Sequence, residues 1–180
     1  LQSFLDTTFM NSNNPAPGMA SMTYADIFYI VGKDPIRQVS PFHLAVRVLQ
    51  EQGQGTSPLI SGTYPGYENL YNYFNVQATG ADDEIVVKGL TYAANGRIRV
   101  LNETTGQLEW VPQPWNNAYY SILGGADVVT ANYIQKGQDT IYLQKFNVGP
   151  ESQYAHYTHQ YMQNIAAPTS EAKNTKKFYT

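Results

Sequence analysis

A single carboxylate stands out in this sequence because it lies at the end of a helical pattern. The stretch from Ser40 to Gly53 reads SPFHLAVRVLQEQG. Ser40 is a favourable N-cap, Pro41 fits the first turn, and Gly53 can adopt the conformation that ends a helix. Glu51 then lies in the last turn, at the border of the apolar stripe. A carboxylic acid in this place can act as a general acid that protonates a leaving group.

Two opposing effects act on Glu51. The partial negative charge at the helix C-terminus and the apolar neighbours Leu44 and Val48 favour the protonated carboxyl group. Arg47, one turn earlier, can instead pair with Glu51 and favour the carboxylate. The helical pattern alone favours the second interpretation, a solvated ion pair in the last turn. The choice between them depends on the segment that comes after the helix.

Other kinds of chemistry find little support in the sequence. Cysteine is absent, no GxSxG motif is present, and no glycine-rich stretch is followed by a Lys-Ser or Lys-Thr pair. His156 and His159 are three residues apart, but no further ligand accompanies them. We therefore expect no metal ion and no organic cofactor.

The composition describes a folded domain with a nearly neutral surface. Charged residues make up 14% of the chain, the net charge is −3, and no cluster of Lys and Arg is present, so we expect no nucleic-acid partner. The most apolar run, 27–31, is too short to span a bilayer, so we expect no membrane insertion. Fifteen tyrosines offer both an apolar ring and a hydroxyl group, which suits the binding of sugars as well as protein interfaces.

Hydrophobic periodicity predicts a mostly helical α+β domain. Helices are expected over 1–9, 23–31, 40–53, 82–95, 118–137, 140–147 and 154–165, and Thr23 with Asp26 resembles a capping box. A hairpin is expected from 98–101 and 107–111. Between the third and fourth helices, residues 53–80 are rich in Gly, Ser, Thr, Pro and Tyr, which predicts a small lobe of short strands and turns.

Three long motifs resemble one known family. They are SPFHLAVRVLQEQGQGTSPLISGTYPGYENLYNYFNVQATG over 40–80, PWNNAYYSILGGADVVTANYIQKGQDTIYLQKFNV over 114–148, and YTHQYMQNI over 157–165. In this order they resemble the catalytic core of bacterial endo-β-N-acetylglucosaminidases of glycoside hydrolase family 73. The resemblance covers roughly residues 19–168.

This resemblance implies a lysozyme-like fold with a substrate groove between the helices and a small β-lobe. It also implies hydrolysis of the GlcNAc-β-1,4-MurNAc bond of peptidoglycan, with Glu51 as the catalytic acid and glycan strands as the partner. The expected location is extracellular, at the cell wall. The chain has no starting Met and no signal-like segment, so we expect a glucosaminidase domain, 19–168, from a longer multidomain protein. A helix and loop, 1–18, would precede it and a polar linker, 169–180, would come after it.

The second catalytic group is left open by the sequence. Glu68 in the lobe is one candidate, and Asp82, Asp83 and Glu84 are weaker ones because acidic residues are favoured at a helix start in any case. Alternatively, the 2-acetamido group of the substrate takes this role. One of the tyrosines Tyr73, Tyr154 or Tyr157 would then orient it.

Further tyrosines and one tryptophan are candidates for contacts with the sugar rings. The resemblance implies that Tyr71 and Tyr73 line the groove near the acid, and the ring chemistry adds Trp115, Tyr119 and Tyr142. Three other functions are compatible with the sequence. They are a muramidase or lytic transglycosylase on the same fold, a non-catalytic glycan-binding module of the cell wall, and a scaffold domain with tyrosines at a protein interface.

Overall fold

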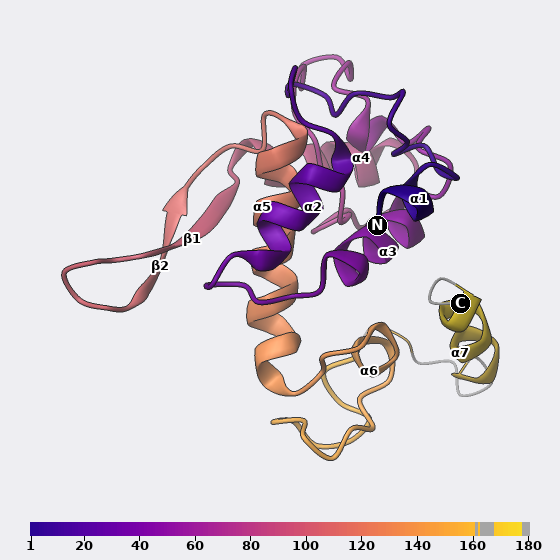
Figure 1. Ribbon diagram of the computed structural model, residues 1–180, viewed down its shortest axis with the longest axis vertical. Coiled ribbons are helices and arrows are strands. Elements are labelled where there is room, and N and C mark those ends of the chain that lie inside the picture. The colour runs from indigo at the N-terminus through magenta and orange to yellow at the C-terminus, as the bar shows by residue number, and fades with distance from the viewer. Residues whose placement is uncertain (161, 163–167, 178–180) are drawn as a thin grey trace. The chain divides into compact units, whose positions relative to one another are not determined.

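The computed structural model describes residues 1–160, 162 and 168–177. It divides into two compact units, Leu1–Asp127 and Val128–Thr180, and each is described by itself. The first unit contains helices α1 to α4, the hairpin β1–β2 and the first part of α5 (Figure 1).

The first three helices lie where the sequence predicts them, but the first of them has only 4 residues and ends well before the end of the predicted range, 1–9. They are α1 (Gln2–Leu5), α2 (Tyr24–Lys33) and α3 (Pro41–Gln52). The capping box of α2 is present, because the Thr23 hydroxyl accepts from the Asp26 amide at 3.2 Å and the Asp26 carboxylate accepts from the Thr23 amide at 2.8 Å. Ser40 occupies the N-cap position of α3, but its side chain makes no capping hydrogen bond. Gly53 ends α3 with a positive φ of 55°.

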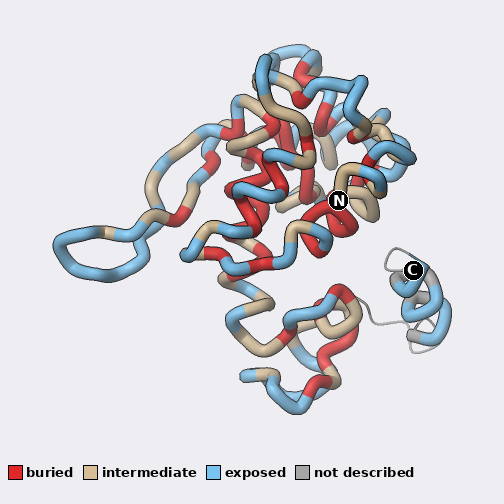
Figure 2. The backbone as a smooth tube through the Cα atoms, viewed as in Figure 1, coloured by how far each residue is buried: buried red, intermediate tan, exposed pale blue. Residues whose placement is uncertain are grey.

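Helices α2 and α3 pack against each other and supply much of the core of this unit (Figure 2). The fully buried side chains include those at helical spacing, which are Ile27, Phe28 and Val31 on α2 and Leu44, Ala45 and Val48 on α3; Val46 on α3 is fully buried as well. A Cβ atom at Gly32 would lie 2.6 Å from the Val39 carbonyl oxygen, so this glycine permits the close approach of the two helices. This packing fixes the position of the last turn of α3.

The segment between α3 and α4 differs in part from the prediction. Residues 53–80 contain turns and the 3-10 helix η1 (Pro58–Ile60), but no strand. After it come α4 (Asp83–Ala94) and the antiparallel strands β1 (Arg97–Leu101) and β2 (Leu108–Pro112), close to the predicted hairpin. The hairpin extends away from the helices of the first unit (Figure 1). The predicted hairpin is therefore confirmed, whereas the short strands expected in 53–80 are replaced by turns and η1.

A buried ion pair ties three parts of the first unit together. Arg37 donates to Asp127 on α5 at 2.7 Å and to the backbone carbonyl of Arg99 on β1 at 2.9 Å. The Arg99 amide donates to the same Asp127 oxygen at 2.8 Å. Burial raises the pKa of Asp127, while the Arg37 guanidinium opposes this shift. The turn after α2 is thus fixed to the base of the hairpin.

The second unit contains the rest of α5 (Ala118–Asn132), the 3-10 helix η2 (Ile134–Lys136), α6 (Ile141–Lys145) and α7 (Pro168–Lys177). The helix predicted over 154–165 is wrong for 154–160, which form turns and bends; 161 and 163–165 lie outside the described residues. Tyr157 and His159 have φ values of 63° and 49°, which a right-handed helix does not allow.

Residues 168–177, most of which belong to the predicted polar linker, form α7. Pro168 is the first residue of this helix, in the first turn, where proline is favoured. None of the helices described for the chain has the length and apolar character needed to cross a membrane.

Candidate active site

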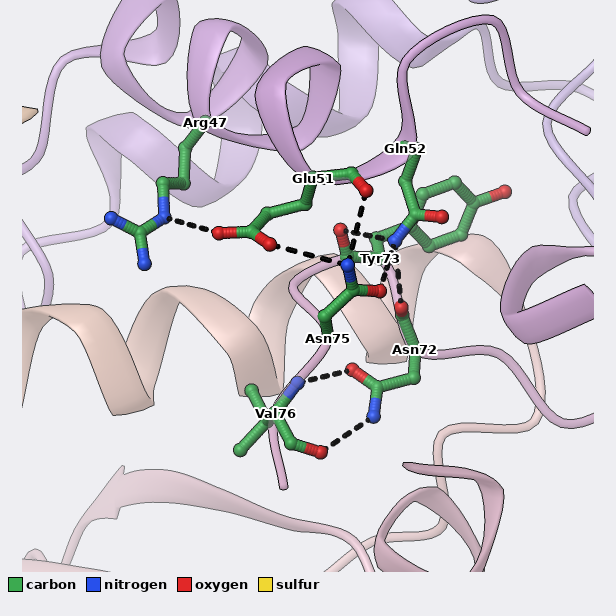
Figure 3. Close-up of polar contacts among 7 residues, drawn as sticks. All are labelled: Arg47, Glu51, Gln52, Asn72, Tyr73, Asn75 and Val76. Atoms are coloured by element: carbon green, nitrogen blue, oxygen red, sulfur yellow. Dashed lines mark hydrogen bonds and ion pairs between the residues drawn. The ribbon is translucent and has the colours of Figure 1, made fainter. Parts of the chain in front are cut away.

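Glu51 lies in the last turn of α3, with both carboxylate oxygens in contact with neighbouring side chains (Figure 3). Its Oε1 is 3.3 Å from Nε of Arg47, whose side chain is largely buried. The ion pair between Glu51 and Arg47, one of the two arrangements that the sequence allows, is therefore present. The Glu51 side chain nevertheless keeps 26% of its surface exposed, so a ligand can reach it.

Asn75 holds the other side of Glu51. Its Nδ2 donates to Oε2 of Glu51 at 3.2 Å and to the backbone carbonyl oxygen of Glu51 at 3.0 Å. One amide group thus contacts both the side chain and the main chain of the same residue. Asn75 has a φ of 50°, in the left-handed region that asparagine tolerates better than most residues.

Gln52, the next residue on α3, fixes the orientation of the Asn75 amide. Its Nε2 donates to Oδ1 of Asn75 at 2.7 Å and to the carbonyl oxygens of Asn72 and Tyr73, both at 3.1 Å. Because Oδ1 of Asn75 accepts from Gln52, the donor end of the same amide faces Glu51 (Figure 3). Two adjacent residues of α3 therefore bind the 72–75 segment.

Asn72 attaches the same segment to α4. Its buried Nδ2 donates to the carbonyl oxygens of Val76 and Gly89, both at 2.9 Å, and its Oδ1 accepts from the Val76 amide at 3.0 Å. The side-chain amides of Gln52 and Asn75 are thus joined to each other, and the Asn72 amide fixes the segment that carries Asn75. The sequence analysis did not identify any of these three residues as part of the site. The position of Gln52 next to Glu51 and the two asparagines of the NYFN stretch were the available signals.

Tyr71 and Tyr73 do not line a groove in this structure; they are buried, at 6% and 0% exposure. The Tyr73 hydroxyl lies 2.7 Å from the Tyr24 hydroxyl, and the two tyrosine rings of 71 and 73 are stacked with centroids 6.4 Å apart. The prediction that they contact sugar is therefore corrected to a role in the core. They position the backbone of the 72–75 segment, whose carbonyl groups bind Gln52.

Comparison with known proteins adds a second line of support for the predicted family resemblance. No family model matches the chain. Bifunctional autolysins from strains of Staphylococcus epidermidis are 28% identical to it over 151 residues, which are 78% of this chain and 9% of each autolysin. The chain is a homologue of these autolysins. It spans only a small part of their length.

Solved structures of S. aureus Autolysin E have a similar fold. One matches with a TM-score of 0.58 at 20% identity and covers 99% of this chain and 63% of that chain. A catalytic mutant in complex with the disaccharide NAG-NAM matches with a TM-score of 0.56 at 21% identity, covering 99% and 66%. Together with the autolysin homology, this confirms the predicted family resemblance and the lysozyme-like, mostly helical fold.

Trp115 of this autolysin homologue is fully buried, which corrects the prediction that it stacks on a sugar ring. Its indole lies 5.3 Å from the ring of Tyr92, and a Cβ atom at Gly124 would overlap it. The prediction was wrong because a tryptophan in a loop sequence can still be the largest side chain of the core. Tyr119 is half-buried, and its ring packs against Tyr120 at 5.4 Å.

Glu68 is exposed and is held by its own lobe. Its Oε1 accepts from the Gly66 amide at 3.1 Å, and backbone hydrogen bonds lower its pKa. Within the described residues, no hydrogen bond or ion pair joins Glu68 to Glu51. A direct role for Glu68 in the reaction therefore stays a prediction.

The remaining candidates belong to the second unit. Tyr142 packs against Phe146 with ring centroids 5.3 Å apart, and Tyr154 stacks on His159 at 3.9 Å. Tyr157 is 76% exposed. Their role in sugar binding stays a prediction. Among the residues that the structure describes, no group of three or more His, Cys, Asp or Glu side chains is placed to hold a metal ion.

Proposed function

We propose that this chain is a peptidoglycan hydrolase domain that cleaves the GlcNAc-β-1,4-MurNAc bond, with Glu51 as the general acid. The observation that carries the proposal is the position of Glu51, accessible at the end of α3 with both oxygens held by Arg47 and Asn75. The autolysin homology and the fold shared with Autolysin E support it. The domain would act on glycan strands outside the cell membrane, at the cell wall.

In this mechanism Glu51 transfers its proton to the glycosidic oxygen as the bond between that oxygen and C1 of GlcNAc breaks. The MurNAc residue leaves as an alcohol, and Glu51 becomes a carboxylate. Arg47 and Asn75 then stabilise the negative charge that forms on Glu51, because the guanidinium charge lies 3.3 Å from Oε1 and the Asn75 amide donates to Oε2. Since this charge develops only as the proton leaves, their contribution is larger in the transition state than in the substrate complex.

A water molecule completes the reaction by adding its hydroxyl group to C1. Either a carboxylate such as Glu68 activates this water, or the 2-acetamido oxygen first attacks C1 and the water then opens the cyclic intermediate. In the first route the proton lost by water goes to Glu68, and exchange with solvent then deprotonates Glu68 and reprotonates Glu51. In the second route the water gives its proton directly to Glu51. GlcNAc is left at the new reducing end.

The test is a digest of purified peptidoglycan by the wild-type chain, by Glu51→Gln and by a control variant, Glu151→Gln, which changes an exposed glutamate in the second unit. The products are reduced with borohydride and identified by mass spectrometry. We expect reduced GlcNAc ends from the wild type and the control. Loss of the general acid should slow turnover by about 10²- to 10⁴-fold.

Other products would identify a different function. Reduced MurNAc or 1,6-anhydroMurNAc ends would indicate a muramidase or a lytic transglycosylase and would contradict the proposed bond specificity. Binding to cell walls without cleavage by the folded wild type would indicate a non-catalytic module. Equal activity of the wild type and Glu51→Gln would exclude Glu51 as the acid.

A further inference from the structure

A cavity of about 480 Å³ lies on the first unit, beside α4. One wall is the turn that carries Gln77 and Thr79, and the other is the face of α4 with Val87, Lys88 and Tyr92, closed by Asn95. This volume lies in the range of pockets that bind small molecules. None of the residues placed around Glu51 lines it.

The cavity and the acid share one segment of the chain. Asn75 donates to the Glu51 carboxylate, and Gln77, two residues later, already belongs to the cavity wall. Two residues span at most about 7 Å from Cα to Cα. The other wall is attached to the same segment, because Asn72 donates to the Gly89 carbonyl of α4. The segment that holds the acid therefore continues directly into the wall of the cavity.

The backbone at the near wall is held in an unusual conformation. Gln77 has a φ of 57°, in the left-handed region that residues other than glycine seldom adopt. Two hydrogen bonds maintain it, from the Thr79 amide to the Gln77 carbonyl at 2.9 Å and from the Ala78 amide to the Asn75 carbonyl at 3.0 Å. The turn thus holds Gln77 and Thr79 together at the wall.

The lining indicates the kind of ligand. Gln77, Thr79 and Asn95 are exposed and supply amide and hydroxyl groups, while Val87 and the ring of Tyr92 supply apolar surface. The ammonium group of Lys88 is paired with Glu84 at 2.7 Å, so the wall offers little net charge to an anion. A neutral molecule with an amide group, several hydroxyl groups and an apolar face fits this lining.

We propose that the cavity is an accessory subsite that binds one N-acetylated sugar residue of the same glycan strand, away from the bond that Glu51 cleaves. This inference rests on the proposed function. It gives the domain a preference for longer strands, since only a strand that occupies both the site at Glu51 and the cavity gains the second set of contacts.

The test uses the Glu51→Gln variant and neutral GlcNAc oligomers of two to six units, with affinities measured by calorimetry. Two further variants alter the cavity: Gln77→Ala removes an amide, and Val87→Glu places a charge at a position that is 38% exposed. Ile30→Glu is the matched control, because Ile30 is an aliphatic residue on α2 that is 46% exposed. Thermal unfolding of each variant verifies that it folds.

We expect the affinity of Glu51→Gln to rise with oligomer length and to lose that rise in both cavity variants. The loss for the longest oligomer should be about tenfold, which corresponds to one or two hydrogen bonds. Binding of the shortest oligomer, and every affinity of the control, should be unchanged. The methyl NMR signals of Val87 should shift only with the longer oligomers.

The outcomes separate this inference from the proposed function. Wild-type digestion of peptidoglycan together with an unchanged length dependence in both cavity variants would overturn the subsite alone. Oligomer binding that shifts Val87, together with a wild type that cleaves no wall, would overturn the proposed hydrolysis and leave the sugar site intact. A Val87 shift with an anionic muropeptide but not with neutral oligomers would overturn the assignment of the ligand.

Discussion

The contact between Asn75 and Glu51 gives the sharpest prediction on how the acid works. Asn75→Ala removes the hydrogen bond to Oε2 of Glu51, which measures 3.2 Å, and keeps the ion pair with Arg47. A hydrogen bond to a charged group contributes about 1.5–3 kcal/mol. If this contribution is made mainly as the charge forms on Glu51, kcat should fall by about 10- to 150-fold.

The assay compares initial rates on solubilised glycan strands with the free energy of unfolding in urea. Asn69→Ala is the matched control, because Asn69 is an exposed asparagine of the lobe that also has a left-handed backbone, with a φ of 58°. The free-energy cost of placing alanine in the left-handed backbone conformation should be the same at both positions. We expect Asn75→Ala to lose more stability than Asn69→Ala, because it also removes the hydrogen bonds with Glu51 and Gln52, and we expect a loss of kcat only in Asn75→Ala. Unchanged kcat in Asn75→Ala would refute this account of the acid.

Gln52 provides a second, independent test of the same reasoning. Gln52→Met keeps the approximate length of the side chain and removes the donor that orients the Asn75 amide at 2.7 Å. If Gln52 acts through Asn75, the substitution should lower kcat in the wild-type background and have little further effect in Asn75→Ala. Strictly additive effects on kcat in the double variant would show that the two residues act separately.

Three further predictions concern the frame of the first unit. Arg37→Met or Asp127→Leu alone should lower the free energy of unfolding, measured in urea, by about 3–5 kcal/mol, because each leaves a buried charge without its partner. The double variant, which leaves no unpaired charge, should lose less than either single variant. Burial raises the pKa of Tyr24 to about 12 and that of Tyr73 well above 10. The contribution of these shifts to the free energy of unfolding is therefore complete below pH 10 and is lost as the pH rises further. The slope of that free energy against pH, up to about 1.4 kcal/mol per pH unit for each tyrosine, should become shallower in the double Phe variant. Trp115→Ala should cost about 3–5 kcal/mol in stability and leave the glycan affinity of the folded protein unchanged; a selective loss of affinity would restore Trp115 as a sugar-binding residue.

Helices α2 and α3 could be predicted because each carries its own signals at both ends or along its length. Thr23 and Asp26 form the capping box that their spacing predicts, and Pro41 and Gly53 bound α3 at the expected residues. The hairpin was found for the same reason, since its alternating pattern and its turn are local features. The turn conformation of 154–160 was missed because left-handed φ values at Tyr157 and His159 have no signal in hydrophobic periodicity.

The aromatic residues show a different limit of sequence reasoning. Tyr73 and Trp115 have the chemistry of sugar-binding residues, but both are fully buried. Which side of a loop faces the core depends on contacts between distant parts of the chain, such as the Tyr73 hydroxyl with that of Tyr24, 49 residues away. Residue type alone cannot separate a ring that packs from one that binds.

The amide network around Glu51 connects these two results. Buried tyrosines fix the backbone of the 72–75 segment, and that backbone presents the carbonyl groups that Gln52 binds at 3.1 Å. Gln52 in turn orients Asn75 toward the acid. The tyrosines of the family motif therefore act on Glu51 through the main chain instead of through a ligand. Substitution of Tyr73 should then change the rate of the reaction by displacing Asn75, with no direct loss of a sugar contact.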